Sequence, residues 1–478
     1  MKLSQLLLDV NTTSVVEDIE ISGVTSDTRQ LRFGDLFVAL RGGAFDGHKF
    51  AEVAMKAGAL AVVCEQDLGL AQQVIVPDTH IAYATICANL MDNPQRKLVM
   101  VGVTGTNGKT TTTHIIKHIL TRCGHKTGLI GTNNIQIGDL TIPAKYTTPD
   151  PMTLFATLRR MVDLGCTHAV MEVSSHGLDQ NRVSGIRFTV GGFTNLTQDH
   201  LDYHGDMGSY FAAKKKLFDA SDRAVVNYDD PYGRQLIEEL GDRAVSFSTR
   251  DDAATYTARG ITVKASGSAF AFVGEGLIAR VQIPMPGEFS VANAMTAISC
   301  CMVLGVPLEQ AAEAAGNCPG VSGRCELLYA GEDFTVIRDY AHTPDGLEKI
   351  LSAIRSFAPG RIVTLFGCAG NRDRTKRPMM AEAVAKHTDF AILTSDNPRH
   401  EDPQQIVDDA LPGLLAQEAK YKVIIDRYEA IKWALDNLEK DDILLLAGKG
   451  HEDYQVLDFG TIYFDEKAIV EELLGRRG

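Results

Sequence analysis

Residues 102–111 read GVTGTNGKTT, and this stretch decides the fold. A buried-strand pattern, KLVMVGVTG, leads into it, and a helical pattern follows it. Glycines in such a strand-to-helix turn let successive backbone N–H groups face a polyphosphate at the helix amino terminus. Lys109 would reach the outer phosphates, and the Thr110 hydroxyl would bind Mg2+. The stretch favours an ATP site over a glycine-rich turn with a surface lysine, although Val103 stands where the general motif has its first glycine.

Strand-like and helix-like patterns alternate along the rest of the chain, which is typical of α/β proteins. Breaks are expected at residues 92–94, where Pro94 disfavours helix before it, and in the glycine-rich stretch 320–331. We therefore predict an α/β fold of three domains. They are a small α/β N-terminal domain (1–95), a central P-loop domain with a mostly parallel, doubly wound sheet (96–328) and a C-terminal Rossmann-like α/β domain (329–478). The other expected strands are LFVAL (36–40), ALAVVCE (59–65), QVIVP (73–77), HAVMEVSS (168–175), RFTVGGFTNL (187–196), RIVTLFG (361–367), FAILTSD (390–396), KVIID (422–426) and DILLLAG (442–448).

The composition excludes several classes of protein. Lys and Arg number 47 against 61 Asp and Glu, a formal charge of -14, which disfavours binding to nucleic acid. No apolar run approaches the roughly 18 residues of a spanning helix, and Asp9 ends the short amino-terminal Leu run, so we expect neither membrane insertion nor a signal peptide. The nine Cys show no paired metal spacing and are odd in number, as expected of reduced thiols in a cytoplasmic protein.

Carboxylate and imidazole groups follow two further expected strands. Glu172 ends one of them, and the segment NLTQDHLDYH (195–204), which contains His200, follows another. Ligands of open α/β sheets gather at the carboxyl ends of the strands, so Glu172 and His200 could face the nucleotide. The alternatives are that His200 and His204 are hydrogen-bonded loop histidines, or that Asp199, His200, Asp202 and His204 form a metallohydrolase centre. Because Mg2+ prefers oxygen ligands and takes some of them from phosphates, a Mg–ATP site is favoured.

Two groups of basic residues need separate interpretations. Residues 214–216 are consecutive lysines in a helical pattern, and such a run is usually a solvated face. Arg372, Arg374, Lys376 and Arg377 follow an expected strand and, in an acidic chain, favour an anion site over a nucleic-acid surface.

Many spaced motifs together resemble the Mur ligase family, whose members use ATP to add amino acids to the growing peptidoglycan precursor. They are GTNGKTT (105–111), YTTPDP (146–151), MEVSSHGLDQNRV (171–183), NLTQDHLDYHGDM (195–207), GRCE (323–326), DYAHTPDGLE (339–348), GNRDRTKRP (370–378), DNPR (396–399) and GKGHEDYQ (448–455). The resemblance covers nearly the whole chain. DNPR and GKGHEDYQ are similar to the branch that adds meso-2,6-diaminopimelate to UDP-N-acetylmuramoyl-L-alanyl-D-glutamate. Ser290 and Cys325 depart from the usual Asn and larger apolar residue at their positions.

The resemblance implies a ligase that uses ATP and Mg2+, passes through an acyl phosphate and acts as a monomer. It implies catalytic roles for Lys109, Glu172, His200 and Lys214, of which Lys214 would be carbamylated (N6-carboxylysine). Mg2+ would be held by Thr110, Glu172, His200 and the Lys214 carbamate. ATP would contact Gly105, Thr106, Asn107, Gly108, Lys109, Thr110, Thr111, Asn293, Arg324 and Asp339. The UDP-muramoyl dipeptide would contact Ser26, Thr28, Gly43, Ala44, Phe45, Thr147, Thr148, Ser174, Gln180 and Arg182. Diaminopimelate would contact Arg372, Asp396, Asn397, Pro398, Arg399, Gly448 and Glu452.

Two other functions remain as alternatives. One is a P-loop regulatory module that hydrolyses ATP slowly and has no acyl acceptor; such a module would not need DNPR or GKGHEDYQ. The other is a ligase of the same family with a different substrate, of the folate or cyanophycin type. The DQNRV segment at 179–183 and the segment from Asp27 to Phe37 favour the muramyl substrate.

Overall fold

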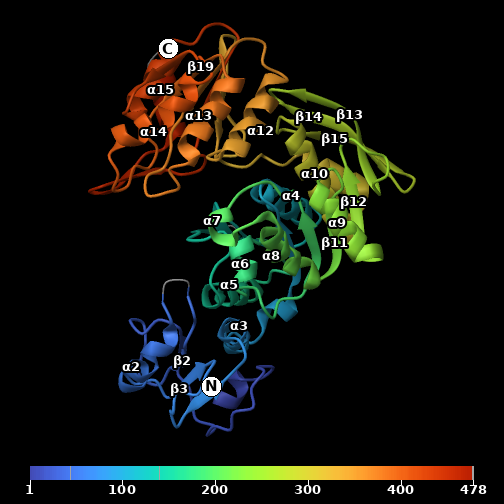
Figure 1. Ribbon diagram of the computed structural model, residues 1–478. Coiled ribbons are helices and arrows are strands. Elements are labelled where there is room, and N and C mark those ends of the chain that lie inside the picture. Colours follow the sequence, from blue (N-terminus) through green and yellow to red (C-terminus); the bar gives the residue numbers. More distant parts are fainter. Residues whose placement is uncertain (43–44, 139, 476–478) are drawn as a thin grey trace.

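The computed structural model describes residues 1–42, 45–138 and 140–475. Three α/β bodies follow one another along the chain, with the N-terminal body at one end and the C-terminal body at the other (Figure 1). No helix in the described ranges has the length and apolar character needed to cross a bilayer. The predicted α/β fold class is confirmed.

The N-terminal body is built on a parallel four-stranded sheet in the order β1-β2-β3-β4. Its strands are β1 (Val24–Thr25), β2 (Leu36–Val38), β3 (Ala61–Cys64) and β4 (Gln73–Ile75). Its helices are α1 (Leu3–Leu6), α2 (Ala51–Lys56) and α3 (Thr79–Leu90), with 3-10 turns at Gly47–Phe50 and Pro94–Lys97. The α3 helix lies beside the central body (Figure 1), so the N-terminal body is attached there.

The central body contains an eleven-stranded sheet in the order β15-β14-β13-β12-β11-β10-β5-β9-β6-β7-β8, parallel from β13 to β6 and antiparallel at both ends. Its strands are β5 (Val99–Thr104), β6 (Thr127–Ile130), β7 (Asn134–Ile137), β8 (Leu140–Pro143), β9 (His168–Glu172), β10 (Phe188–Phe193), β11 (Ser221–Asn227), β12 (Ala244–Ser248), β13 (Tyr256–Lys264), β14 (Gly267–Gly274) and β15 (Leu277–Ile283). Its helices are α4 (Lys109–Arg122), α5 (Pro151–Asp163), α6 (Ser175–Asp179), α7 (Leu201–His204), α8 (Met207–Asp219), α9 (Pro231–Leu240), α10 (Glu288–Val303) and α11 (Leu308–Gly316). Successive residues of β5 enter different apolar clusters, Met100 on one face of the sheet and Val101 on the other, which explains the unbroken apolar run in the sequence.

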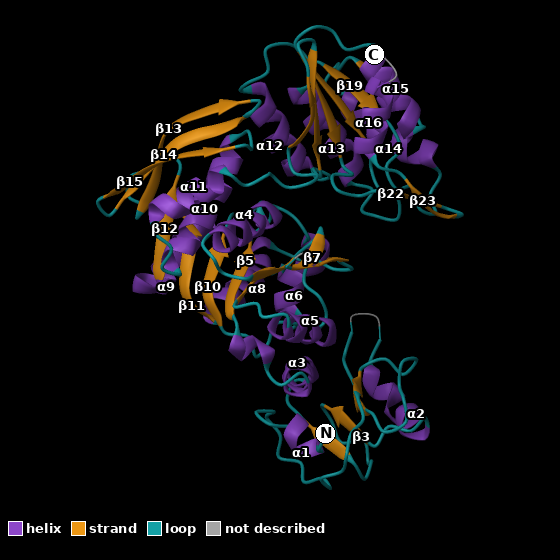
Figure 2. Cartoon of the chain, turned by 180° about the vertical axis from the view of Figure 1, so that it is seen from behind, coloured by secondary structure: helices purple, strands orange, loops and turns teal. Residues whose placement is uncertain are grey.

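The C-terminal body contains a six-stranded sheet in the order β16-β17-β21-β18-β19-β20, parallel except at β16. Its strands are β16 (Glu326–Ala330), β17 (Phe334–Asp339), β18 (Ile362–Phe366), β19 (Phe390–Leu393), β20 (Tyr421–Val423) and β21 (Asp442–Ala447), and β22 (Tyr454–Leu457) and β23 (Gly460–Tyr463) form a separate hairpin (Figure 2). Its helices are α12 (Pro344–Arg355), α13 (Lys376–His387), α14 (Pro403–Leu415), α15 (Arg427–Asp436) and α16 (Glu466–Gly475). The boundary expected between residues 328 and 329 falls inside β16, so the change from one sheet to the next comes earlier in the chain.

Candidate active site

The predicted phosphate loop joins β5 to α4, as the sequence indicates. Gly108 precedes the helix with a φ of 87°, and a Cβ there would collide with the side chain of Asn293 on α10, so this position requires glycine. Lys109 Nζ donates to the carbonyl oxygens of Gly105 at 2.8 Å and Thr106 at 2.9 Å. The lysine therefore lies folded over the loop to which a polyphosphate would bind.

Lys214, on α8, reaches the same loop from the other side. Its Nζ donates to the Gly105 carbonyl at 2.9 Å, and the residue is only 1% exposed. Burial, and after it the positive charge of Lys109, holds the pKa of Lys214 well below the ordinary lysine value. Burial also lowers the pKa of Lys109, against the opposing charge of Glu172. Two lysines thus share one carbonyl oxygen at the phosphate loop.

Glu172, at the end of β9, is fully buried and connects this loop to a second group of polar residues. Its Oε2 accepts from Thr110 Oγ1 at 3.0 Å and from Thr132 Oγ1 at 2.9 Å, while Oε1 accepts from Thr132 N at 2.8 Å. A hydroxyl and a carboxylate in contact at a phosphate loop are the hard oxygen donors that suit Mg2+. Sequence reasoning missed Thr132, which lies in a loop and in none of the quoted motifs.

His200 lies in the loop before α7, where its Nε2 is 3.4 Å from Asp199 Oδ2 and its ring centroid is 4.9 Å from that of His176. It forms no hydrogen bond with Thr110 or Glu172 in the part of the chain that the structure describes, so its metal role stays a prediction. Within these same ranges no three His, Cys, Asp or Glu side chains are grouped so that they could hold a metal ion. The metallohydrolase alternative therefore gains no support from the geometry.

Five residues predicted to bind the muramoyl dipeptide form a continuous network that starts at Glu172. Thr147 Oγ1 is 3.0 Å from Thr132 Oγ1, and Thr148 Oγ1 donates to the Glu172 carbonyl and lies 3.0 Å from Ser174 Oγ. The remaining contacts are Arg182 Nη1 to the Thr148 carbonyl (2.7 Å) and Arg182 Nη2 to Gln180 Oε1 (2.6 Å).

The dipeptide-binding residues predicted in the N-terminal body are not brought to this network by any hydrogen bond between described residues. Ser26 and Thr28 are half-buried there, and Phe45 is 62% exposed. Gly43 and Ala44 lie outside the described residues. The contribution of these five positions stays a prediction.

The C-terminal body reaches the phosphate loop through two side chains. Arg324 Nη2 donates to Thr110 Oγ1 at 3.3 Å, and the guanidinium lies over the Tyr340 ring. Asp345, at the start of α12, accepts through Oδ2 from Asn107 Nδ2 at 2.8 Å and from Thr197 Oγ1 at 2.9 Å. Sequence reasoning missed this role of Asp345, although the residue lies in the DYAHTPDGLE motif.

Asp339, predicted to contact ATP, forms hydrogen bonds with the protein backbone. Its carboxylate accepts from the backbone N–H groups of Cys325 and Ala341, both at 2.7 Å. Burial raises the pKa of Asp339, although Arg324 opposes the shift. The predicted contact with ATP is untested.

The residues predicted to bind diaminopimelate lie after three neighbouring strands: Arg372 follows β18, and the others follow β19 or β21, which flank β18. Asn397 Nδ2 donates to Glu452 Oε2 at 2.9 Å, and a Cβ added to Gly448 would lie 3.7 Å from Asp396 Oδ2. Burial and the neighbouring Asp396 raise the pKa of Glu452. Arg399, which follows Pro398, has a φ of 55°, and its N–H donates to the Val456 carbonyl at 3.0 Å. Arg372 is exposed.

The basic cluster after β18 differs from the interpretation as an anion site. Arg377 is almost fully buried and pairs with Glu401 at 2.9 Å and Asp409 at 2.7 Å, while Arg374 pairs with Asp409. Both arginines are paired with carboxylates of the same body. They connect α13 and the residues just before it to α14 and the loop that precedes α14. Lys376 instead pairs with Asp199 of the central body at 3.5 Å.

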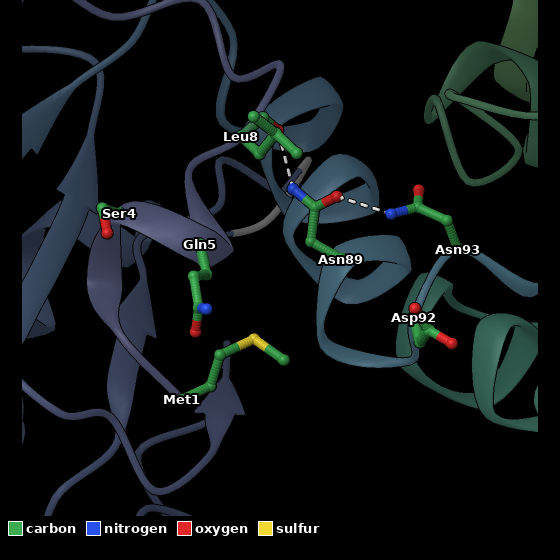
Figure 3. A pocket seen from close by; sticks show the side chains of 7 residues that line it. All are labelled: Met1, Ser4, Gln5, Leu8, Asn89, Asp92 and Asn93. Carbon is green, nitrogen blue, oxygen red and sulfur yellow. Dashed lines mark hydrogen bonds between the residues drawn. The ribbon is translucent and has the colours of Figure 1, made fainter.

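Figure 3 shows a pocket beside α1 and the end of α3, and its lining residues are not among those of the site described above. It is lined by Met1, Ser4, Gln5, Leu8, Asn89, Asp92 and Asn93. Asn89 Nδ2 donates to the Leu8 carbonyl at 2.6 Å, and Asn93 Nδ2 donates to Asn89 Oδ1 at 2.9 Å. These bonds connect α1 to the end of α3, so the pocket belongs to the junction before the central body.

Comparison with known proteins covers all three bodies. Family models for the Mur ligase catalytic domain, the Mur ligase middle domain and the Mur ligase glutamate ligase domain match residues 20–101, 103–301 and 323–450. The UDP-N-acetylmuramoyl-L-alanyl-D-glutamate–2,6-diaminopimelate ligase 1 of Clostridium acetobutylicum is 41% identical over 99% of both chains. The corresponding ligase of Caldanaerobacter subterraneus subsp. tengcongensis is 42% identical over 96% of this chain and 95% of its own.

Solved structures agree in fold over the full length. A structure of UDP-N-acetylmuramoyl-L-alanyl-D-glutamate–2,6-diaminopimelate ligase has a TM-score of 0.73 and 30% identity, covering 100% of this chain and 99% of that one. The MurF ligase from Thermotoga maritima in complex with ADP has a TM-score of 0.61 at 18% identity, covering 97% of this chain and 100% of that one. At that identity the second likeness concerns the fold alone.

Proposed function

Because this chain belongs to the Mur ligase family, we propose that it is an ATP-dependent ligase of peptidoglycan precursor synthesis. It joins meso-2,6-diaminopimelate to the glutamyl carboxylate of UDP-N-acetylmuramoyl-L-alanyl-D-glutamate, the substrates in the names of its relatives. The observation that carries the proposal is the position of Glu172. This one carboxylate contacts Thr110 of the phosphate loop and, through Thr132, the hydroxyl of Thr147, so nucleotide side and acceptor side meet there.

The reaction needs an activated carboxylate, because a free carboxylate is a poor acyl donor. A carboxylate oxygen attacks the γ-phosphorus of ATP, and the bond from that phosphorus to the bridging oxygen breaks. The products of this step are ADP and an acyl phosphate. The amino group then attacks the acyl carbon, the C–N bond forms with loss of a proton, and phosphate departs. Phosphoryl transfer depends on positioning and on neutralising charge. Lys109 and Arg324 supply fixed positive charge, and the Asp345 bridge to Asn107 holds the C-terminal body against the loop, where it would keep water from the acyl phosphate.

Mg2+, when bound, would neutralise phosphate charge. Thr110 and Glu172 would hold it, with His200 and a carbamate on Lys214 as the further proposed ligands. Thr106, Thr111 and Asn293 would line the nucleotide beside the loop glycines. We propose that the chain acts as a monomer and that, because it would use ATP and a nucleotide-linked precursor, it acts in the cytoplasm.

The amino-acid pocket would bind both charged groups at the far end of diaminopimelate, its distal ammonium and its distal carboxylate. Glu452 and Asp396 would accept from the distal ammonium, and Arg399, assisted by Arg372, would pair with the distal carboxylate through two parallel hydrogen bonds. Lysine lacks that carboxylate and would leave Arg399 unpaired, which disfavours its binding.

ADP release by the purified chain tests this function. The assay combines ATP and Mg2+ with UDP-N-acetylmuramoyl-L-alanyl-D-glutamate and a panel of amino acids including meso-diaminopimelate, L-lysine and L-glutamate. We expect ADP release to require both the dipeptide and meso-diaminopimelate. Release without an acceptor would favour the regulatory module, and a preference for another amino acid would favour a ligase with a different substrate.

A further inference from the structure

Lys449 is a fully buried lysine behind the proposed amino-acid pocket, and no role was predicted for it. It follows β21 in a turn where Gly448 and Gly450 adopt φ values of 110° and 53°. A Cβ on Gly450 would crowd the Tyr340 side chain, so glycine is required there. The turn directs Lys449 into the protein, toward the residues that follow β19.

Lys449 fixes the orientation of Asn397. Its Nζ donates to Asn397 Oδ1 at 3.1 Å and to the Tyr454 carbonyl at 2.7 Å. The Val456 N–H donates to the same Asn397 oxygen at 2.9 Å. With two donors on its oxygen, the amide must direct its NH2 group the other way, where it donates to Glu452 Oε2. Lys449 and the Val456 N–H together therefore direct the Asn397 amide to Glu452 Oε2, which leaves Oε1, with one long contact from the Tyr340 hydroxyl at 3.5 Å, for a ligand.

Lys449 also sets the charge of the pocket. Its Nζ lies 3.4 Å from Asp396 Oδ1 and 3.7 Å from Glu452 Oε2. Asp396 Oδ1 is buried and has no hydrogen-bond partner among the described residues. Two carboxylates and one ammonium leave a single negative charge, which matches one ammonium group of a ligand. Without Lys449, two like charges would face each other in a buried site.

We propose that Lys449 is a positioning residue that makes the pocket select amino acids with a second ammonium group at their far end. The inference rests on the proposed function and deepens it: Arg399 reads the distal carboxylate, whereas Lys449 prepares Glu452, Asp396 and Asn397 for the distal ammonium. A pocket built to hydrogen-bond a group rejects the analogue that lacks it.

The test compares meso-diaminopimelate with 2-aminopimelate, which keeps the distal carboxylate and lacks the distal amine. Kinetics are measured on full-length wild type and Lys449→Met, with Lys440→Met, an exposed lysine of the same body, as the matched control. We expect Lys449→Met to raise the KM for meso-diaminopimelate about 10- to 100-fold and to lose most of its preference over 2-aminopimelate. The KM values for ATP and the UDP-dipeptide should stay within about twofold, because Lys449 contacts neither proposed site.

An unchanged preference for the diamine in Lys449→Met, or an equal rise in all three KM values, would overturn the inference. If that variant does not fold, Lys449→Gln, which keeps an N–H donor and lacks the charge, is measured in the same way, and the same selective loss is expected. A wild-type chain that ignores meso-diaminopimelate would contradict the proposed function itself. A wild type that uses it beside an indifferent variant would contradict only the role of Lys449.

Discussion

Lys214 and Lys449 are both withdrawn from solvent, one in the central body and one in the C-terminal body, yet their surroundings are opposite. Lys214 Nζ donates to one backbone carbonyl and lies 4.6 Å from the centroid of the Tyr210 ring, and no carboxylate of the described residues forms an ion pair with it. Lys449 Nζ has two carboxylates, a side-chain amide oxygen and a carbonyl around it. Burial alone therefore does not define what a lysine does; the acceptors around it do.

The difference decides which form of each amine is stabilised. Burial and Lys109 lower the pKa of Lys214, which favours the neutral amine. Only a neutral amine has the lone pair that can attack CO2, forming an N–C bond and losing a proton to give a carbamate. The surroundings of Lys214 thus support the proposed carbamate, because the poorly solvated amine is favoured in the neutral form that can react with CO2. Lys449 Nζ instead lies beside two carboxylates, Asp396 and Glu452, which form ion pairs with it.

The largest expected effect concerns Lys214, the lysine proposed to form a carbamate. Lys214→Ala should reduce turnover about 10^3-fold, because the proposed carbamate ligand for Mg2+ would be lost, and formate or acetate should restore part of the activity. Lys216→Ala, two residues along the same helix, is the control, since Lys216 is exposed and pairs with Asp179 at 3.2 Å. ADP-release rates with and without added carboxylate measure the effect. Equal rates in the two variants would show that Lys214 has no special role.

The sequence predicts the turn, the strands and several partner residues of both lysine sites, but it gives no role to Thr132 or Lys449. GVTGTNGKTT predicts the turn because its glycines and helix start are adjacent, and the apolar runs predict β5, β9, β19 and β21. The contact of Thr132 with Glu172 spans 40 residues, and that of Lys449 with Asn397 spans 52. Neither separation has a period or motif that pattern reading can detect. The same holds for Arg374 and Arg377, whose matching carboxylates follow much later in the chain.

The second prediction tests Arg399, the residue proposed to bind the distal carboxylate in the pocket that Lys449 lines from behind. Arg399→Ala should lower kcat/KM for meso-diaminopimelate about 100-fold and reduce the preference over lysine, since the proposed charge-assisted pair with the distal carboxylate would be lost. A purely structural role is disfavoured because Glu401 already pairs with Arg377 and Asp402 caps α14 at Gln404.

Arg374→Ala is the matched control for that variant. Arg374 is an exposed arginine with a carboxylate partner, Asp409, and exposed pairs contribute only about 0–1 kcal/mol. Competition between meso-diaminopimelate and lysine in one assay measures the preference directly. A preference that survives Arg399→Ala intact would remove this residue from the pocket.

The third prediction asks whether the two lysine sites work as one. Asp345 connects the C-terminal body, which contains Lys449, to the phosphate loop that Lys214 contacts. It does so through hydrogen bonds with Asn107 and Thr197. Asp345→Ala should raise the KM for ATP about tenfold, because two hydrogen bonds to a carboxylate are lost at the loop. Lys349→Ala removes only the partly exposed third partner of Asp345 and should change this KM little. Equal ATP affinity in Asp345→Ala and wild type would mean that the bodies meet without this bridge.

The smallest expected effect is a gain in stability, and its sign separates the two lysines. In metal-free, CO2-depleted buffer, Lys214→Met should raise the unfolding temperature by about 1–2 °C, roughly 1 kcal/mol, because a poorly solvated amine is replaced by an apolar chain. Lys449→Met should lower it, since Asp396 and Glu452 lose their counter-charge.

The gain in Lys214→Met should also depend on pH. The folded pKa of Lys214 lies below the ordinary value of 10.5, so the unfolded chain binds more protons between these two values, and wild-type stability rises with pH across that window. The cost of keeping Lys214 is therefore largest at the acid end and disappears as the pH approaches 10.5. Calorimetry at about pH 6.5 and about pH 9.5 should find the larger difference between Lys214→Met and wild type at the lower pH. A pH-independent difference, or a loss of stability like that of Lys449→Met, would mean that Lys214 is as well compensated as Lys449, and the case for a neutral amine poised to form a carbamate would fail.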